Sequence, residues 1–185
     1  MRWILFGVAL IPLAIFIALL GSGLSGPKAQ SAVPIINTQS YKVESDRKLA
    51  PDFKLGNLTE QEPIVLSALR GNIVLLDFWS SWCPPCRIEA PELVAAYSAY
   101  KNAPVEFIGI SVWDDATDAA QHINKYQVNY LNGIDSNGET ALDYGVKGLP
   151  EKYLINRQGL IVGKYAGPMS RQMLRNLIDT LLIEP

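Results

Sequence analysis

Residues 73–86 read Ile-Val-Leu-Leu-Asp-Phe-Trp-Ser-Ser-Trp-Cys-Pro-Pro-Cys and contain the only two cysteines of the 185-residue chain. The apolar run over 73–79 predicts a strand covered on both faces of a sheet, and a helical pattern begins near Pro84. Cys83 and Cys86 would then lie at a strand-to-helix junction, where a Cys-x-x-Cys pair is typical of a redox motif. A disulfide closing so small a loop restrains the unfolded chain little, because this stabilisation grows with loop length. We therefore interpret the pair as reactive rather than structural.

The predicted helix gives the two sulfurs different roles. Cys83 would lie at the helix N-terminus, where unpaired N–H groups and the macrodipole favour a thiolate. Pro84 and Pro85 suit the first turn, because their missing N–H groups would be unpaired there anyway. Cys86, one turn further, would be the more buried thiol that resolves a mixed disulfide. A zinc site would need two more ligands, and His122 is the only histidine, so we expect no metal and no cofactor.

The chain opens on an apolar stretch. Residues 4–20 hold no charged or polar side chain, which is close to the roughly 20 residues that a membrane-spanning helix needs. We predict a single-pass transmembrane signal-anchor over 1–24, with the rest of the chain on the exported side of the membrane. A cleaved signal peptide is the alternative, because residues 29–31 (Ala-Gln-Ser) loosely resemble a cleavage site. Residues 25–48 are rich in Ser, Pro, Gln and Asn and predict a flexible tether.

Export changes the interpretation of the cysteines. Structural disulfides are common outside the cytosol, yet this chain has no second pair to form one. In an exported protein, a Cys-x-x-Cys pair as the only thiols indicates an electron carrier. A net charge of −2 is too small to indicate a nucleic-acid partner, and the sequence contains no basic cluster.

From residue 49 onward the pattern alternates strands and helices. The expected strands are 73–79, 105–112 and 129–134, followed by a hairpin of 152–155 and 160–165. The expected helices are 84–101, 117–126, 140–144 and 170–182. Parallel strands joined by helices, closed by an antiparallel hairpin, predict an α/β domain over 49–185 with a mixed central sheet and helices on both faces.

Three segments resemble thioredoxins. Residues 77–86 (Asp-Phe-Trp-Ser-Ser-Trp-Cys-Pro-Pro-Cys) resemble their active-site segment, and Pro91 matches the proline within their active-site helix. Residues 148–150 (Gly-Leu-Pro) resemble the loop that carries their cis-proline opposite the cysteines. The resemblance implies a thioredoxin fold in which Pro150 is cis and shapes the substrate groove.

Other segments resemble a narrower group, the membrane-anchored thiol:disulfide interchange proteins of cytochrome c maturation (the CcmG/DsbE family). These segments are the predicted anchor, 50–53 (Ala-Pro-Asp-Phe), 86–89 (Cys-Arg-Ile-Glu), 114–115 (Asp-Asp) and 144–151 (Tyr-Gly-Val-Lys-Gly-Leu-Pro-Glu). The resemblance implies a protein-disulfide reductase that acts on the heme-binding Cys-x-x-Cys-His segment of apocytochrome c. It also implies that a membrane thiol-electron donor of the DsbD/CcdA type returns the oxidised cysteine pair to its reduced form. One departure is Asp77, where these proteins often carry Asn.

Two alternatives remain open. The first is a general exported thioredoxin-like reductase of the ResA or TlpA type that serves other envelope proteins. The second is a redox-inert docking domain that holds unfolded chains in the groove near Pro150, against which the two intact cysteines argue. The motif does not fix the direction of electron transfer, because Cys-x-x-Cys potentials span roughly −270 to −120 mV.

Two acids are candidates for proton transfer. Asp77 lies in the apolar strand, where a carboxylate is costly unless it is paired or protonated, and we predict that it accepts the proton of Cys86. A structural Asp at the strand end is the alternative. Glu89 lies one helical turn after Cys86 on the same face and is predicted to be a second acid acting on the thiols, with a solvated helix glutamate as the alternative.

The remaining candidates concern the substrate groove and its surroundings. The expected substrate contacts are Trp82, Pro84, Pro85, Leu149, Pro150 and Glu151. We expect Asp114 and Asp115 to be ordinary loop residues and His122 to lie on a helix surface.

Overall fold

The computed structural model describes residues 40–43 and 47–183, with side chains over 47–183. Their centre is an eight-stranded sheet in the order β1-β8-β7-β4-β5-β6-β2-β3. The strands β4 (Ile73–Trp79), β5 (Val105–Val112) and β6 (Leu131–Asp135) are parallel neighbours. Every other pair of neighbouring strands in this sheet is antiparallel. The strands that form only antiparallel pairs are β1 (Ser40–Val43), β2 (Lys54–Asn57), β3 (Ile64–Val65), β7 (Glu151–Ile155) and β8 (Ile161–Ala166). The predicted mixed sheet is confirmed.

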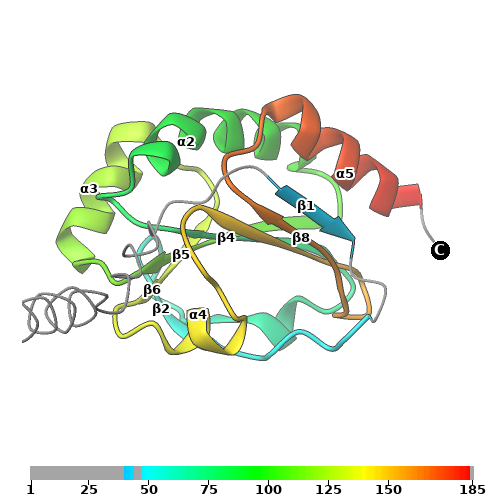
Figure 1. Ribbon diagram of the computed structural model, residues 1–185, viewed down its shortest axis with the longest axis horizontal. Helices are drawn as coiled ribbons and strands as arrows, with labels where there is room; N and C mark the ends of the chain where they lie inside the picture. Colours follow the sequence, from blue (N-terminus) through cyan, green and yellow to red (C-terminus); the bar gives the residue numbers. More distant parts are fainter. Residues whose placement is uncertain (1–39, 44–46, 184–185) are drawn as a thin grey trace, which may run out of the picture. The chain divides into compact units, whose positions relative to one another are not determined.

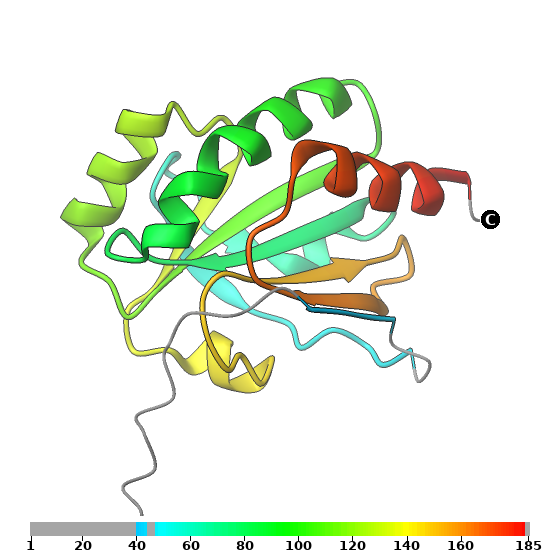
Figure 2. The ribbon, with the colours of Figure 1, turned by 45° about the horizontal axis from the view of Figure 1, so that its top comes forward.

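Helices cover both faces of this sheet, also as predicted. They are α2 (Pro84–Tyr97), α3 (Ala116–Tyr126), α4 (Glu139–Asp143) and α5 (Arg171–Ile183), with short 3-10 turns η1 (Leu66–Leu69) and η2 (Ser98–Tyr100). Figures 1 and 2 show α2, α3 and α5 on one face and α4 on the other. The crossovers β4-α2-β5 and β5-α3-β6 step in the same direction along the sheet, so right-handed connections place α2 and α3 on the same face.

The side chains of each strand alternate between the two faces of the sheet, so the apolar core has two parts. Ile73 and Leu75 of β4 pack with the buried sides of α2 and α5, whereas Leu76 and Phe78 belong to the cluster that includes Tyr144, which follows α4. Successive side chains of a strand point to opposite faces. The odd-numbered positions of β4 therefore face the helix that carries the cysteines.

The N-terminal part of the domain differs from expectation. Residues 40–43, expected to belong to the flexible tether, form β1, whose register runs from Ser40 opposite Ala166 to Val43 opposite Gly163. The sequence does not identify this strand, because four alternating residues are too short a pattern and their partner β8 lies far along the chain. The predicted anchor over 1–24 lies outside the described residues. Among the described residues, no helix is long and apolar enough to cross a membrane.

His122 is buried, so its expected place on a helix surface is wrong. Its ring stacks on Trp79 at a centroid distance of 4.4 Å and on Tyr126 at 4.6 Å. Burial, with the nearby charge of Arg87 as the next cause, lowers the pKa of His122 to about 4. The neutral imidazole is thus part of the packing between α3 and the end of β4.

A glycine makes room for a buried hydrogen bond close by. Trp79 Nε1 donates to Asn132 Oδ1 at 3.1 Å, and Asn132 is fully buried. A Cβ atom on Gly109 would lie 2.0 Å from Asn132 Oδ1 and 2.7 Å from Trp79 Nε1. Only glycine therefore fits at this point of β5.

We predict that Gly109→Ala destabilises the domain by at least about 2 kcal/mol, because overpacking adds to the loss of a buried hydrogen bond. Urea unfolding followed by circular dichroism measures this. The matched control is Gly56→Ala in β2, where the new Cβ would meet Ile134 at an ordinary 3.6 Å and should change stability by less than about 0.5 kcal/mol. Equal effects of the two substitutions would refute this account of Gly109.

A second prediction concerns acid stability. The folded-state pKa of His122, about 4, lies below its ordinary value of 6.5. The unfolded chain therefore binds the proton first as the pH falls. The stability that His122 contributes is present above about pH 6.5 and is lost towards pH 4, by on the order of 1–3 kcal/mol. His122→Phe cannot take up the proton, so its unfolding free energy should fall less than that of wild type between pH 7 and pH 4.5. Parallel pH dependences would contradict the prediction.

Candidate active site

The two cysteines form a disulfide at the start of α2. Their Cα atoms are 5.3 Å apart, and Cys83 is the N-cap residue, whose Sγ accepts a hydrogen bond from the Cys86 N–H at 3.3 Å. Pro84 and Pro85 occupy the first helical positions, as predicted. An N-cap acceptor satisfies an otherwise unpaired helix N–H, and the same group would stabilise negative charge on the sulfur.

Burial does not distinguish the two cysteines in this oxidised form. Cys83 is 0% exposed and Cys86 is 4% exposed, although Cys83 was expected to be the more accessible. The disulfide holds Cys83 Sγ over the first helical turn, against Cys86. The assignment of Cys83 as the attacking thiol concerns the reduced protein and stays a prediction.

The loop before Cys83 is held by the loop after β5. Asp114 accepts hydrogen bonds from the Ser81 backbone N–H at 2.5 Å, from Ser81 Oγ at 2.8 Å and from Ser111 Oγ at 2.9 Å. Trp82 Nε1 donates to the Trp113 carbonyl at 3.2 Å. Asp114 is therefore more than an ordinary loop residue, because it fixes the approach to the redox pair. Asp115 instead caps α3 by accepting from the Thr117 N–H.

The Leu149–Pro150 peptide bond is cis, as expected, and the role of Pro150 in a substrate groove stays a prediction. This bond immediately precedes β7, which pairs with β4 so that Glu151 lies opposite Phe78. Pro150 therefore lies at the end of the sheet where β4 leads into the cysteine motif. Leu149 is buried in the same apolar cluster as both cysteines, so its side chain supports the site from within rather than from its surface.

A buried charge network lies on the α2 side of the sheet. Lys152 Nζ of β7 lies 2.9 Å from Asp77 Oδ1 of β4 and 2.6 Å from Glu89 Oε2 of α2. Glu89 Oε1 also accepts a hydrogen bond from the Met169 N–H at 2.7 Å. All three charged residues are buried. Glu89 is therefore not a solvated glutamate, and Asp77 has an ion-pair partner.

The network has its own protonation behaviour. Burial raises the pKa of Glu89 to about 7, against the opposing charge of Lys152. Burial alone would lower the pKa of Lys152, but the two carboxylates hold it above its ordinary value. Lys152 therefore stays charged, while Glu89 exchanges a proton near neutral pH. The sequence interpretation missed Lys152, because its place opposite Asp77 depends on the register of β7 against β4, which only the structure shows.

Glu151 lies on the other face of the sheet. Its Oε1 is 2.6 Å from Lys164 Nζ and accepts a hydrogen bond from Tyr153 at 3.0 Å, and its side chain is buried. Neighbouring strand residues point to opposite faces, so Glu151 and Lys152 cannot both face α2. The structure does not support the expected direct contact between Glu151 and substrate.

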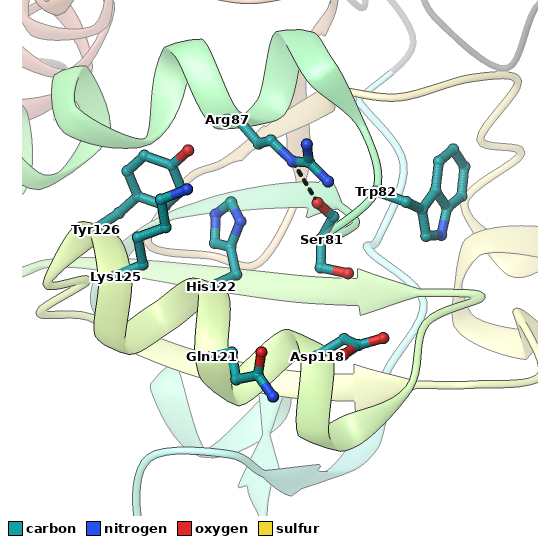
Figure 3. A pocket seen from close by; sticks show the side chains of 8 residues that line it. All are labelled: Ser81, Trp82, Arg87, Asp118, Gln121, His122, Lys125 and Tyr126. Carbon is teal, nitrogen blue, oxygen red and sulfur yellow. Dashed lines mark hydrogen bonds between the residues drawn. The ribbon is translucent and has the colours of Figure 1, made fainter.

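A polar cleft of about 380 Å³ lies beside the motif, between the start of α2 and α3. Figure 3 shows Arg87 reaching the Ser81 carbonyl, to which its Nε donates a hydrogen bond at 2.6 Å. Trp82 lies on the other side of Ser81 from Arg87. The lining residues are Ser81, Trp82, Arg87, Asp118, Gln121, His122, Lys125 and Tyr126. Trp82 is 39% exposed, so it offers an accessible apolar surface next to Cys83. Within the described part of the chain, no three His, Cys, Asp or Glu side chains are grouped to hold a metal ion.

Comparison with known proteins agrees with this geometry. The AhpC/TSA family model matches residues 47–164. The chain is 36% identical over 138 residues to the thiol:disulfide interchange protein HelX of Rhodobacter capsulatus, covering 73% of this chain and 76% of HelX. It is 32% identical over 136 residues to the thiol-disulfide oxidoreductase ResA of Bacillus subtilis, covering 74% of each chain.

A solved structure shows the same fold. A thiol:disulfide interchange protein of the DsbE type from Chlorobium tepidum superposes with a TM-score of 0.69 at 29% identity, over 74% of this chain and 96% of that one. The fold is thus the thioredoxin fold that the resemblance implied. The chain belongs to the AhpC/TSA family and is a thioredoxin-like thiol:disulfide oxidoreductase of the CcmG/DsbE type.

Proposed function

We propose that this protein reduces the disulfide in the heme-binding Cys-x-x-Cys-His segment of apocytochrome c, and that residues 1–24 anchor it in the inner membrane with its domain in the periplasm. The observation that carries the proposal is the Cys83–Cys86 disulfide at the N-terminus of α2, because it is the product that such a reductase forms in each cycle. The similarity to HelX and to a DsbE-type protein supports it.

The reaction follows from the positions of the two sulfurs. In the reduced protein the Cys83 thiolate attacks one sulfur of the substrate disulfide, the substrate S–S bond breaks, and the second substrate sulfur leaves as a thiolate and takes up a proton. Cys86 then loses its proton to a buried carboxylate, Asp77 or Glu89, and attacks Cys83. The Cys83–Cys86 bond forms, the other substrate sulfur is released as a thiolate, and two electrons have passed to the substrate.

We infer the surface that contacts the substrate from the side chains that are exposed beside the disulfide. Trp82 and Pro84 are exposed and Pro85 is partly exposed beside the disulfide, so they can meet a substrate chain directly. Pro150 is buried at the same end of the sheet, and we assign it a role in shaping the inner wall of the groove. The oxidised pair needs two electrons to return to its starting state, and we assign their supply to a membrane thiol-electron donor of the DsbD/CcdA type.

A general exported reductase is the second candidate. The observation that favours it is the 32% identity to ResA over 74% of the chain, a value close to that for HelX. The two candidates share the cysteine chemistry and differ only in substrate, so substrate trapping separates them.

We predict that Cys86→Ser accumulates a mixed disulfide through Cys83, because the thiol that resolves it is missing. Trapping in the envelope followed by mass spectrometry should identify an apocytochrome c joined through its heme-binding cysteines. The matched control is Cys83→Ser, which retains one thiol at the same helix end and should trap much less. Recovery of unrelated envelope proteins alone would favour the general reductase.

We also predict that deleting the gene abolishes covalently attached heme in c-type cytochromes, and that a small added thiol reductant partly restores it, because only reduction is missing. Heme staining of membrane proteins with and without reductant measures both effects. A complementing gene that carries Cys83→Ser and Cys86→Ser separates redox function from binding and should fail to restore heme. Normal holocytochrome in the deletion strain would remove apocytochrome c as the substrate.

A further inference from the structure

Lys152 is the least expected charge in the domain. Its side chain is 1% exposed, and it lies in the middle of the sheet, on β7 opposite Asp77 of β4. Burying an ammonium group is costly, and an apolar side chain of similar size often serves stability as well or better than a buried ion pair. Stability alone therefore gives a poor reason for a lysine here.

The position of Lys152 relates it to the redox pair. Its two carboxylate partners come from β4, which leads into the motif, and from α2, which carries both cysteines. Glu89 follows Cys86 by one helical turn, and both lie on the buried side of α2. Lys152 itself follows the cis Pro150 by two residues. The ammonium thus joins the three segments that build the site.

The charges in this network do not balance. With both carboxylates ionised, two negative charges face one positive charge, and uptake of a single proton makes the network neutral. Two further titratable groups of the described domain, Tyr130 and Tyr165, interact with it. Burial raises the pKa of both tyrosines above 10, so they stay neutral. The network therefore has room for one proton, which is the number that Cys86 releases when it closes the disulfide.

We propose that Lys152 is a positioning residue: its ammonium holds the carboxylates of Asp77 and Glu89 together and favours the charged form of Glu89, so that Glu89 can accept the proton of Cys86. The proposal rests on the reductase chemistry described above. In the resolving step, the Cys86 S–H bond breaks, its proton passes to the Glu89 carboxylate, and the thiolate forms the bond to Cys83 Sγ while the substrate sulfur leaves as a thiolate. Lys152 exchanges no atom and no electron in this step.

The test is the pH dependence of the resolving step in Lys152→Met. Reduced protein is mixed with glutathione disulfide, quenched with an alkylating reagent, and the decay of the Cys83–glutathione mixed disulfide is followed by mass spectrometry from pH 5 to pH 9. In wild type the rate should rise through an inflection near pH 7. In Lys152→Met, Glu89 holds its proton more tightly, because the neighbouring positive charge is gone. An upward shift of the inflection by one pH unit would lower the rate at pH 7 about fivefold, with recovery near pH 9.

The matched control is Lys164→Met. Lys164 lies on the adjacent strand β8 and is ion-paired with the buried Glu151 at 2.6 Å, but on the face of the sheet away from α2. Its replacement should leave the inflection in place. Lys152→Gln removes the charge while keeping an amide that can donate to the carboxylates, and it decides the question if Lys152→Met does not fold.

Two results would overturn the proposal. One is a folded Lys152 variant whose inflection coincides with that of wild type. The other is a rate that falls by the same factor at every pH, which indicates a structural role alone. Glutathione disulfide contains no cytochrome sequence, so a shifted inflection combined with no preference for a Cys-x-x-Cys-His peptide would reject the proposed substrate and leave the role of Lys152 standing.

Discussion

Strand β4 is buried at each of its seven residues and nevertheless carries a carboxylate, Asp77. A charge in such a strand requires a cation within reach, and the cation is Lys152 on the neighbouring strand β7. This requirement helps to fix the register of the two strands. A slip by one residue would turn Lys152 away from α2 and bring the carboxylate of Glu151 to that face instead. The same register places the cis Pro150 at the end of β4, so the ion pair and the geometry of the redox site depend on each other.

The exposed side of the site depends on a second set of contacts. Asp114 accepts hydrogen bonds from both the backbone and the side chain of Ser81, and the Trp113 carbonyl accepts one from Trp82. These hydrogen bonds hold the loop that leads to Cys83 against the residues that follow β5. The helix N-terminus can favour a thiolate only if the sulfur is held at its end. The loop contacts therefore serve the chemistry by limiting where the sulfur can move.

Local sequence patterns were sufficient to predict much of the fold. The apolar run of β4, the prolines at the start of α2 and the hairpin of β7 and β8 each lie within a short stretch of sequence, and each was predicted. Strand β1 was not, because its four residues become a strand only by pairing with β8, more than a hundred residues away. His122 was assigned to a helix surface because one turn of sequence does not reveal that α3 packs over Trp79.

The sequence by itself determined the redox pair, since two cysteines two residues apart at a strand-to-helix junction have no other partner in the chain. It also identified Asp77 as an acid in an apolar strand and Glu89 as an acid one helical turn after Cys86. Only the tertiary structure decided which acids act together. Lys152 and Glu151 are neighbours in sequence, yet the pleat of β7 sends one towards the cysteine helix and the other to the opposite face. Which charges meet depends on strand order and register, and these are set by contacts among segments far apart along the chain.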